Sequence, residues 1–474
     1  MKRTFLLALT LLGGCSFAPK YVRPTPAVPQ SWPVRDATLL ASEADLASLS
    51  YRDIFKDPKL VSLMDKALAN NQDLRAAIAN VEAARGLYRV QRADLFPAID
   101  FTGDVTRRDN GSTTSSTTGN IQSSGARTSY NVDLGTTAFE LDIFGRIRNL
   151  NTAALNTYFA AESASRAVRL TLVSDVAEAY FTLAADRTLL AIAKETEANA
   201  QKSVALTQAR LKGGVAPRTD LRQAETILAT AQADRANLTT LVQQDRNALD
   251  LLVGTPVTDA DLPDSLESVE GLVVPVAPGL DSSILLRRPD VLEAEYQLRA
   301  ANARIGAARA AFFPRISLTG LAGFASNALS ALFKNDSFSY TAGASATLPI
   351  FDGGANAGNL AAAKAQAEAA TANYQKTIQT AFREVADALA RRATIADQVG
   401  AQQRLEAAAR DTAMLTEARY KGGVDSFLSS LDAQRTLYGA RRSLASAQLL
   451  RVTNLIALYR AVAGDALTSD APAR

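Results

Sequence analysis

The spacing of hydrophobic residues switches between two periods along this chain, and each period predicts a different element. After Pro97, Ile99 and Phe101 alternate with polar residues. This period of two predicts β-strands with one apolar and one polar face, over about 98–107 and 129–143. On either side of the strands, apolar residues recur every three to four positions, which is typical of helices. The chain is therefore expected to combine amphipathic strands with helices.

The helical stretch over 145–253 is far longer than helices in ordinary globular domains, which average about 11 or 12 residues. Its first part, up to Lys212, has no proline and no glycine after Gly145. At about 1.5 Å per residue it would be about 100 Å long. Gly213 and Gly214 then predict a turn, because glycine is favoured just beyond the end of a helix. A pair of long helices with coiled-coil spacing is expected.

The same series of patterns occurs twice. The phrase ARLKGGVAP begins at Ala209 and ARYKGGVDS begins at Ala418. In the same way LFPAIDFTG, which leads into the first strand, matches FFPRISLTG, which leads into the third. We expect an internal duplication in which each copy supplies a helix, two strands and a long helix pair.

The duplication and the N-terminal sequence, which is discussed below, divide the chain into segments. They are a signal peptide (1–14), a lipid-anchored extended linker (15–56), repeat 1 (57–254, with the strands above and helix pair 145–253), an inter-repeat linker (255–283, where the family resemblance given below implies an equatorial region), repeat 2 (284–464, with strands about 315–325 and 338–351 and helix pair 355–463) and a C-terminal tail (465–474).

The strands determine how this chain is expected to meet a membrane. No segment after the leader has 18 continuous apolar residues, so any crossing would have to use strands in a closed barrel. Four strands per chain are too few, because bacterial outer-membrane barrels have about eight or more. Several copies must then pool strands: two copies would supply eight and three would supply twelve. Three copies are favoured, because twelve strands leave a usable lumen. The aromatic residues Phe101, Tyr130, Phe338 and Tyr340 suit the interfaces of such a barrel.

The amino-acid composition excludes several classes of catalytic and binding site. Lysine and arginine total 51 and aspartate and glutamate 48, so the formal net charge is +3 and nothing indicates a nucleic-acid partner. The chain has no histidine, which excludes histidine-based acid–base catalysis and histidine metal sites. No nucleotide-binding loop and no constellation of paired carboxylates with a base occurs. We expect no enzyme activity, no metal site and no cofactor.

The only cysteine, Cys15, ends a leader of the form MKRTFLLALTLLGGC, with a basic start and an apolar run. The LGGC ending resembles a bacterial lipobox, which implies cleavage before Cys15 and lipid on its sulfur and new amino group. Ser16 follows instead of an aspartate, which implies sorting to the outer membrane. An ordinary leader with a cysteine at the cleavage site is the alternative.

Four phrases at the joints of the duplicated unit resemble the outer-membrane efflux proteins, the TolC-type exit ducts, and most closely their lipid-anchored branch. They are LLRRPDVLEAEYQLRAANARIGAARAAFFPRISLTG (285–320), RLKGGVAPRTDLRQAE (210–225), RYKGGVDSFLSSLDAQRTL (419–437) and LLVGTP (251–256). The resemblance implies a homotrimer in the outer membrane, with a 12-stranded β-barrel continued by a 12-helix α-barrel. It also implies a periplasmic adaptor protein and an inner-membrane, proton-driven transporter as partners.

The resemblance assigns roles to the ends of the helix pairs. Adaptor docking is expected at Gly213, Gly214, Val215 and Ala216 and at Gly422, Gly423, Val424, Asp425 and Ser426, although helix capping alone would also explain the glycines. A periplasmic gate is expected just before the second turn, at Asp411, Met414, Leu415, Glu417, Arg419 and Tyr420. These residues could equally be solvated flanks of the helices, and the family's aspartate ring has no residue-by-residue counterpart here.

The predicted function is a passive exit duct for drugs or other small molecules. Two alternatives remain: an exit duct for type I protein secretion, and a non-conducting periplasmic coiled-coil scaffold. The amphipathic strands favour a duct, because a scaffold does not need them.

Overall fold

The computed structural model describes residues 17–33, 50–109, 112–114, 121–123, 126–275, 282–334 and 336–462. The predicted signal peptide, Cys15 and the tail 465–474 lie outside these ranges. The chain forms two compact units. Among the described residues, unit 1 comprises 17–24, 81–161 and 294–374, and unit 2 comprises the remainder.

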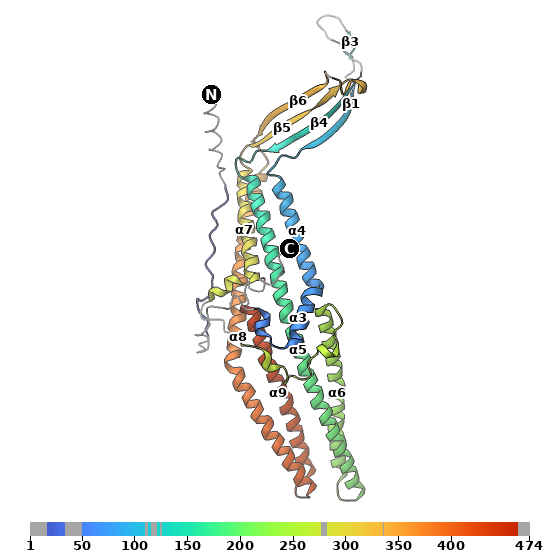
Figure 1. Ribbon diagram of the computed structural model, residues 1–474. Coiled ribbons are helices and arrows are strands. Elements are labelled where there is room, and N and C mark those ends of the chain that lie inside the picture. Colours follow the sequence, from blue (N-terminus) through green and yellow to red (C-terminus); the bar gives the residue numbers. More distant parts are fainter. Residues whose placement is uncertain are drawn as a thin grey trace. The chain divides into compact units, whose positions relative to one another are not determined.

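The elements alternate between helices and strands along the chain (Figure 1). In order they are α2 (Tyr51–Ile54), α3 (Pro58–Asn70), α4 (Gln72–Ala93), β1 (Asp100–Arg108), β2 (Ser112–Thr114), β3 (Ile121–Ser123), β4 (Arg127–Glu140), α5 (Arg146–Lys212), α6 (Arg218–Val253), three 3-10 turns η3 (Asp259–Asp261), η4 (Glu270–Leu272) and η5 (Ser282–Arg287), α7 (Pro289–Ala310), β5 (Arg315–Ser326), η6 (Leu329–Ala331), β6 (Phe338–Thr347), α8 (Ala355–Lys421) and α9 (Phe427–Val462).

The long helices show the duplication directly. α5 and α8 both have 67 residues, and α6 and α9 both have 36. This equality confirms the predicted internal duplication, with two strands of the main sheet and one long helix pair in each copy. Among the described residues, no helix is both long enough and apolar enough to cross a lipid bilayer.

The two 67-residue helices, α5 and α8, each begin just after an aspartate that accepts hydrogen bonds from backbone amides. Asp142 accepts from the amides of Ile147 at 3.2 Å and Arg148 at 2.8 Å. Asp352 accepts from the amides of Gly354 and Asn356, each at 2.9 Å. A carboxylate there satisfies amides that the first turn leaves unpaired and favours the positive end of the helix dipole. The change from strand to helix is therefore specified locally in each repeat.

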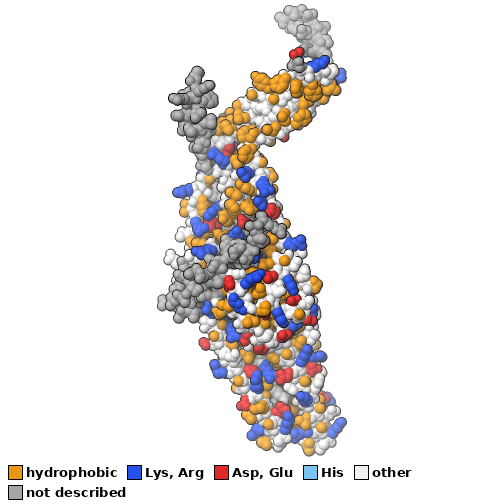
Figure 2. Space-filling model, viewed as in Figure 1, with side chains coloured by type: hydrophobic (Ala, Val, Ile, Leu, Met, Phe, Trp, Pro, Cys, Tyr) orange, Lys and Arg blue, Asp and Glu red, His pale blue; other side chains and the backbone are white. Residues whose placement is uncertain are grey.

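Unit 1 contains one antiparallel sheet with strand order β1-β4-β5-β6. Directly paired residues of an antiparallel sheet lie on the same face, so the register defines two faces. One face carries the row Phe101, Leu134, Ala322 and Tyr340, and the next row includes Val132, Phe324 and Phe338. The side chains of Phe101 and Tyr340 are 73% and 77% exposed, so this face is apolar and uncovered in the single chain. Hydrophobic side chains dominate the sheet in the view of Figure 2.

The opposite face of the sheet is polar. Thr102 pairs with Asp133, and Asp104 pairs with Asn131, whose amide group donates to the Asp104 carboxylate at 3.2 Å. The alternation predicted from the sequence thus produces one lipid-compatible and one water-compatible face. The outer edges of β1 and β6 have no partner strand within the described residues.

A bulge bends the sheet where the apolar frame of the sequence shifts. The pairing of β4 with β5 slips between Thr136 and Phe139, next to Gly135. A Cβ atom at Gly135 would lie 2.0 Å from the carbonyl oxygen of Gly320, so the backbones approach more closely there than any side chain allows. Such bulges increase the local twist of a sheet.

Several segments differ from the sequence-based expectation. The second strand of repeat 2 ends at Thr347 instead of about 351, because Pro349 has no amide hydrogen to continue the ladder. The polar connection after β1 contains the paired strands β2 and β3. The predicted linker 15–56 is not a free tether: α2 lies within it, and residues 17–23 bind α7, as described below.

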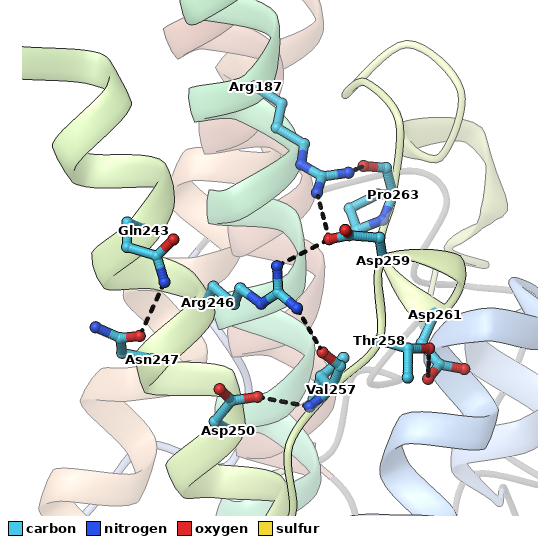
Figure 3. Close-up of polar contacts among 10 residues, drawn as sticks. All are labelled: Arg187, Gln243, Arg246, Asn247, Asp250, Val257, Thr258, Asp259, Asp261 and Pro263. Atoms are coloured by element: carbon cyan, nitrogen blue, oxygen red, sulfur yellow. Dashed lines mark hydrogen bonds and ion pairs between the residues drawn. The ribbon is translucent and has the colours of Figure 1, made fainter. Parts of the chain in front are cut away.

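The predicted inter-repeat linker folds back onto the helix pair of repeat 1 in unit 2 (Figure 3). Asp259 accepts from Arg246 at 2.9 Å and lies 3.9 Å from Arg187. The guanidinium of Arg246 also donates to the carbonyl oxygen of Val257 at 3.0 Å, and the Val257 amide donates to Asp250. This part of the linker therefore ties α5 to α6 instead of merely joining the repeats.

We expect Gly135→Val to destabilise the sheet by about 1–3 kcal/mol, because the new side chain would have to push the β5 backbone away. Gly343→Val is the matched control, since no atom lies within 4 Å of a Cβ at this β6 position. Thermal unfolding in detergent compares the two. Equal midpoints for both variants would contradict the close approach at Gly135.

Candidate functional site

The turn between α5 and α6 is a Schellman motif. The amide of Val215 donates to the carbonyl oxygen of Arg210 at 3.0 Å, and the amide of Gly214 donates to that of Leu211 at 3.0 Å. These bonds satisfy carbonyl groups that the end of a helix otherwise leaves unpaired. Gly214 has a φ of 73°, the left-handed conformation that this motif requires.

The turn between α8 and α9 has the same geometry. The amide of Val424 donates to the carbonyl oxygen of Arg419 at 2.9 Å, and the amide of Gly423 donates to the carbonyl oxygen of Tyr420 at 3.0 Å. Gly423 has a φ of 77°. The doubled phrase KGGV therefore encodes one turn, used twice.

The two glycines of each turn are not equivalent. Only the second one, Gly214 or Gly423, has a positive φ. At the first one, Gly213 or Gly422, an added Cβ would lie no closer than 3.5 Å to the nearest atom, which is an ordinary van der Waals contact. The turn thus explains the second glycine and leaves the first unexplained. At both turns the glycines and the following valine are exposed.

After the valine the two turns diverge. Asp425 accepts two hydrogen bonds from the guanidinium of Arg419, at 2.7 and 2.9 Å, which lowers the pKa of Asp425. The Ser426 hydroxyl then accepts from the amide of Ser429 at 3.3 Å. In the first turn Ala216 and Pro217 replace these polar residues, and Pro217 caps α6 without a side-chain hydrogen bond. The two tips therefore share a backbone and present different chemistry.

Arg210 of the first turn uses its charge differently from its counterpart Arg419. Its guanidinium lies over the ring of Tyr420 at 4.7 Å, a cation–π contact between the two hairpins. Tyr420 packs against Phe427 at a centroid distance of 5.1 Å and belongs to a buried cluster with Ala224 and Leu431. This cluster, which we call the tip cluster, joins α5, α6, α8 and α9 close to both turns.

Polar contacts continue between the hairpins beyond the tip cluster. The Tyr438 hydroxyl donates to Asp234 at 2.7 Å, and burial followed by this carboxylate raises the pKa of Tyr438 to about 12. Arg441 donates to Glu195 at 2.9 Å and lies 3.4 Å from Glu406, a carboxylate only 9% exposed. The α8–α9 hairpin is therefore held to the α5–α6 hairpin by directional bonds as well as by packing.

A cavity of about 780 Å³ lies between the two hairpins. Its walls combine apolar side chains such as Leu206, Met414 and Leu428 with charged ones such as Glu417 and Arg435. It shows that the hairpins do not pack tightly along this part of their length.

The predicted gate residues have different environments. Met414 and Leu415 are 62% and 52% exposed, and Asp411 is also exposed. Glu417 pairs with Lys421 at 2.6 Å. Arg419 pairs with Asp425, and Tyr420 is only 5% exposed within the tip cluster. The Tyr420 ring packs between the hairpins, so a place in a gate ring would require it to leave the tip cluster.

Metal-binding groups are not gathered in the part of the chain that the structure describes: no three of its acidic residues lie close enough together to hold an ion.

Comparison with known proteins identifies the family. The sequence profile described as "Outer membrane efflux protein" matches residues 63–255 and 280–464. The chain belongs to this family. Its members are efflux components and not enzymes, as the sequence predicts. The solvent efflux pump outer membrane protein SrpC of Pseudomonas putida is 42% identical, over 97% of each chain. The cation efflux system protein CusC of Escherichia coli K12 is 39% identical, over 97% of this chain and 98% of the relative.

Solved structures agree with this assignment. A membrane protein from Pseudomonas aeruginosa has a TM-score of 0.87 at 39% identity, covering 94% of this chain and all of that one. The open state of the MtrE outer membrane channel of Neisseria gonorrhoeae has a TM-score of 0.85 at 36% identity, covering 96% and 99%. The fold class predicted from the sequence is confirmed by these channels.

The residues that connect the hairpins were not predicted from the sequence. Arg210, Asp234, Tyr438 and Arg441 lie on helical stretches whose charge pattern looks like an ordinary solvated face. One difference between the two turns was visible in the sequence. Asp425, which binds Arg419 in the second turn, is replaced by Ala216 in the first. Arg210 therefore lacks this ion pair and contacts Tyr420 of the other hairpin.

We expect Gly214→Ala to destabilise the α5–α6 turn by about 1 kcal/mol, because alanine disfavours a positive φ. Gly213→Ala is the matched control and should be neutral or slightly stabilising, since its Cβ fits. Amide hydrogen exchange of the residues around the turn measures both. A Gly213→Ala variant that loosens the turn as much as Gly214→Ala would show that both glycines are structural.

Proposed function

We propose that this protein is the passive exit duct of a tripartite efflux pump, carrying drugs or other small molecules across the outer membrane and the periplasm. The observation that carries the proposal is the combination of an open, amphipathic sheet with two long, glycine-tipped hairpins in a chain of the outer membrane efflux family.

The sheet supports a homotrimer. Among the residues that the structure describes, the outer edges of β1 and β6 have no strand partners, and unpaired backbone amides and carbonyls are costly in lipid. Pairing β1 of one copy with β6 of the next satisfies both edges. Three copies give a 12-stranded barrel with the apolar face toward lipid and the polar face toward a water-filled lumen.

The tips support docking of a periplasmic adaptor. Gly213 and Gly422 expose backbone at positions where the fold would accept a side chain. A docking helical hairpin gains from the close approach that glycine permits, which accounts for a residue that the turn does not require. The adaptor would link the duct to an inner-membrane, proton-driven transporter, the source of energy for a protein without a nucleotide-binding motif of its own.

We propose fewer gate residues than the six predicted from the sequence. Asp411, Met414, Leu415 and Glu417 remain candidates for rings around the periplasmic opening, because three of them are exposed and Glu417 engages only its neighbour on the same helix. A ring of carboxylates there would favour cations. Arg419 and Tyr420 instead hold the tip in shape, through Asp425 and the tip cluster.

The proposed location is the outer membrane, with the helices extending into the periplasm and a lipid anchor on Cys15. Support comes from the LGGC sequence before Ser16 and from the family.

The function is tested with the double variant Gly213→Leu/Gly422→Leu in a strain lacking its own copy. We expect susceptibility to solvents and antibiotics to match that of the deletion strain, since leucine would block the close approach of the adaptor. The variant should keep normal levels in the outer membrane, because both glycines are exposed and a Cβ at either position makes only ordinary van der Waals contacts in the single chain.

Leu206→Ala, on α5 within the cavity wall, is the control and should retain efflux. Full resistance in the double variant would overturn the docking proposal. Unchanged susceptibility on deleting the wild-type gene, together with loss of a secreted protein, would favour the secretion alternative.

A further inference from the structure

The N-terminal strap, residues 17–23, lies along one stripe of α7 within unit 1. The contacts use Glu295, Arg299, Asn302, Gly306 and Arg309 and then Phe313, in the turn after the helix. Their spacing of four, three, four, three and four residues is that of a single helical face. We call this stripe the seat. All six residues belong to the phrase 285–320, which the efflux function does not otherwise explain.

Glu295 is the centre of the seat. Its carboxylate, 3% exposed, accepts from Arg23 at 2.6 and 3.1 Å, from Arg299 at 2.6 Å and from the Tyr21 hydroxyl at 3.1 Å. Arg299 also lies over the Tyr21 ring at 4.9 Å. Burial raises the pKa of Glu295, but the hydrogen bonds from both arginines outweigh it and hold that pKa below its usual range. A buried carboxylate is tolerated only when it is paired in this way.

The rest of the seat holds the strap backbone. Asn302 donates to the carbonyl oxygen of Pro19 at 2.8 Å, and Arg309 donates to that of Phe17 at 3.0 Å. Between them, a Cβ at Gly306 would lie 2.7 Å from the amide nitrogen of Ala18, so the strap passes where a side chain would stand.

The start of the strap is fixed by aromatic packing. The Phe17 ring stacks on Phe313 at a centroid distance of 4.6 Å, and Phe313 stacks on Phe144 at 4.9 Å. Phe313 lies two residues before β5, whose apolar face begins at Ile316. The seat therefore brings the strap to the end of the sheet where the apolar surface starts.

From these contacts we infer that the seat on α7 is a built binding site for the chain's own N-terminal strap, and that its role is to fix the membrane anchor at a set level beside the sheet. The inference rests on the proposed lipid attachment at Cys15. Two residues of extended chain span at most about 7 Å, so an anchor on Cys15 could not reach far from Phe17. The bound strap would then fix the level of the lipid anchor relative to the sheet.

Trypsin digestion of the purified, full-length protein tests whether the strap is held. The Lys20–Tyr21 bond lies inside the strap, and cleavage there separates the anchor from the channel. We expect the wild type to resist, and Glu295→Gln and Arg23→Ala to raise the cleavage rate by about tenfold or more, because each breaks the central pair.

The matched control is Arg304→Ala, an exposed arginine on α7 outside the seat, which should behave as the wild type. Arg23→Ala alters only the strap and so keeps the test valid if the Glu295 variant fails to fold. Cleavage of both variants at the wild-type rate would overturn the seat.

The positioning role is tested in cells with Arg23→Ala, by outer-membrane fractionation and drug susceptibility. We expect the variant to remain in the outer membrane with efflux reduced several-fold, since the anchor would no longer fix the level of the sheet. Full efflux from a released strap would overturn this role. Mass spectrometry of the N-terminal peptide separates the two claims: an unmodified Cys15 would contradict the lipid anchor and leave the trypsin result unaffected.

Discussion

The central physical constraint in this molecule is that backbone polar groups cannot be left unpaired in lipid. The sheet β1-β4-β5-β6 has an apolar face that is exposed in the single chain, and its two edges have no partner strand in the part of the chain that the structure describes. Sharing the edges among copies resolves both problems at once. The proposed trimer, its lumen and its role as a duct all depend on this pairing, since without it the amphipathic strands would have no stable place in a membrane.

The duplication explains why the two halves of the chain share the same helix starts and the same helix turns. Each copy uses the same aspartate-capped start of a 67-residue helix and the same Schellman turn at its end. The two turns share their backbone geometry, but the side chains that follow the valine differ. Asp425 holds Arg419 within its own turn, whereas Arg210 has no such partner and contacts Tyr420 of the other hairpin. The two equivalent arginines therefore have different roles: Arg419 stabilises its own turn, and Arg210 connects the two hairpins.

Much of the fold could be predicted from the sequence, because local signals determine it. The glycine pairs, Pro97 and the alternating strands around Phe101 specify where helices end and strands run, and even the bulge near Gly135 is visible as a shift of the apolar frame.

The contacts between distant segments could not be predicted in this way. The burial of Tyr420 depends on a hairpin 200 residues away in sequence, and the binding of residues 17–23 to α7 depends on Glu295, which on its own reads as one more charge on a helix. The described residues 17–33 contain no helix, as the prolines there would favour, but an extended conformation does not reveal what the chain lies against. Long-range packing is set by surfaces that form only after the elements fold.

Disulfide cross-linking between sheet edges tests the central claim most directly. A cysteine replacing Thr102 on β1 is combined in turn with one replacing Ser339, Thr341 or Gly343 on β6, all on the polar face. Within one chain these edges are separated by two strands, about 14 Å, too far for a disulfide. If the sheet edges pair between neighbouring copies, at least one pair of cysteines should give covalent trimers in oxidised membranes. Monomers alone from all three pairs would contradict it.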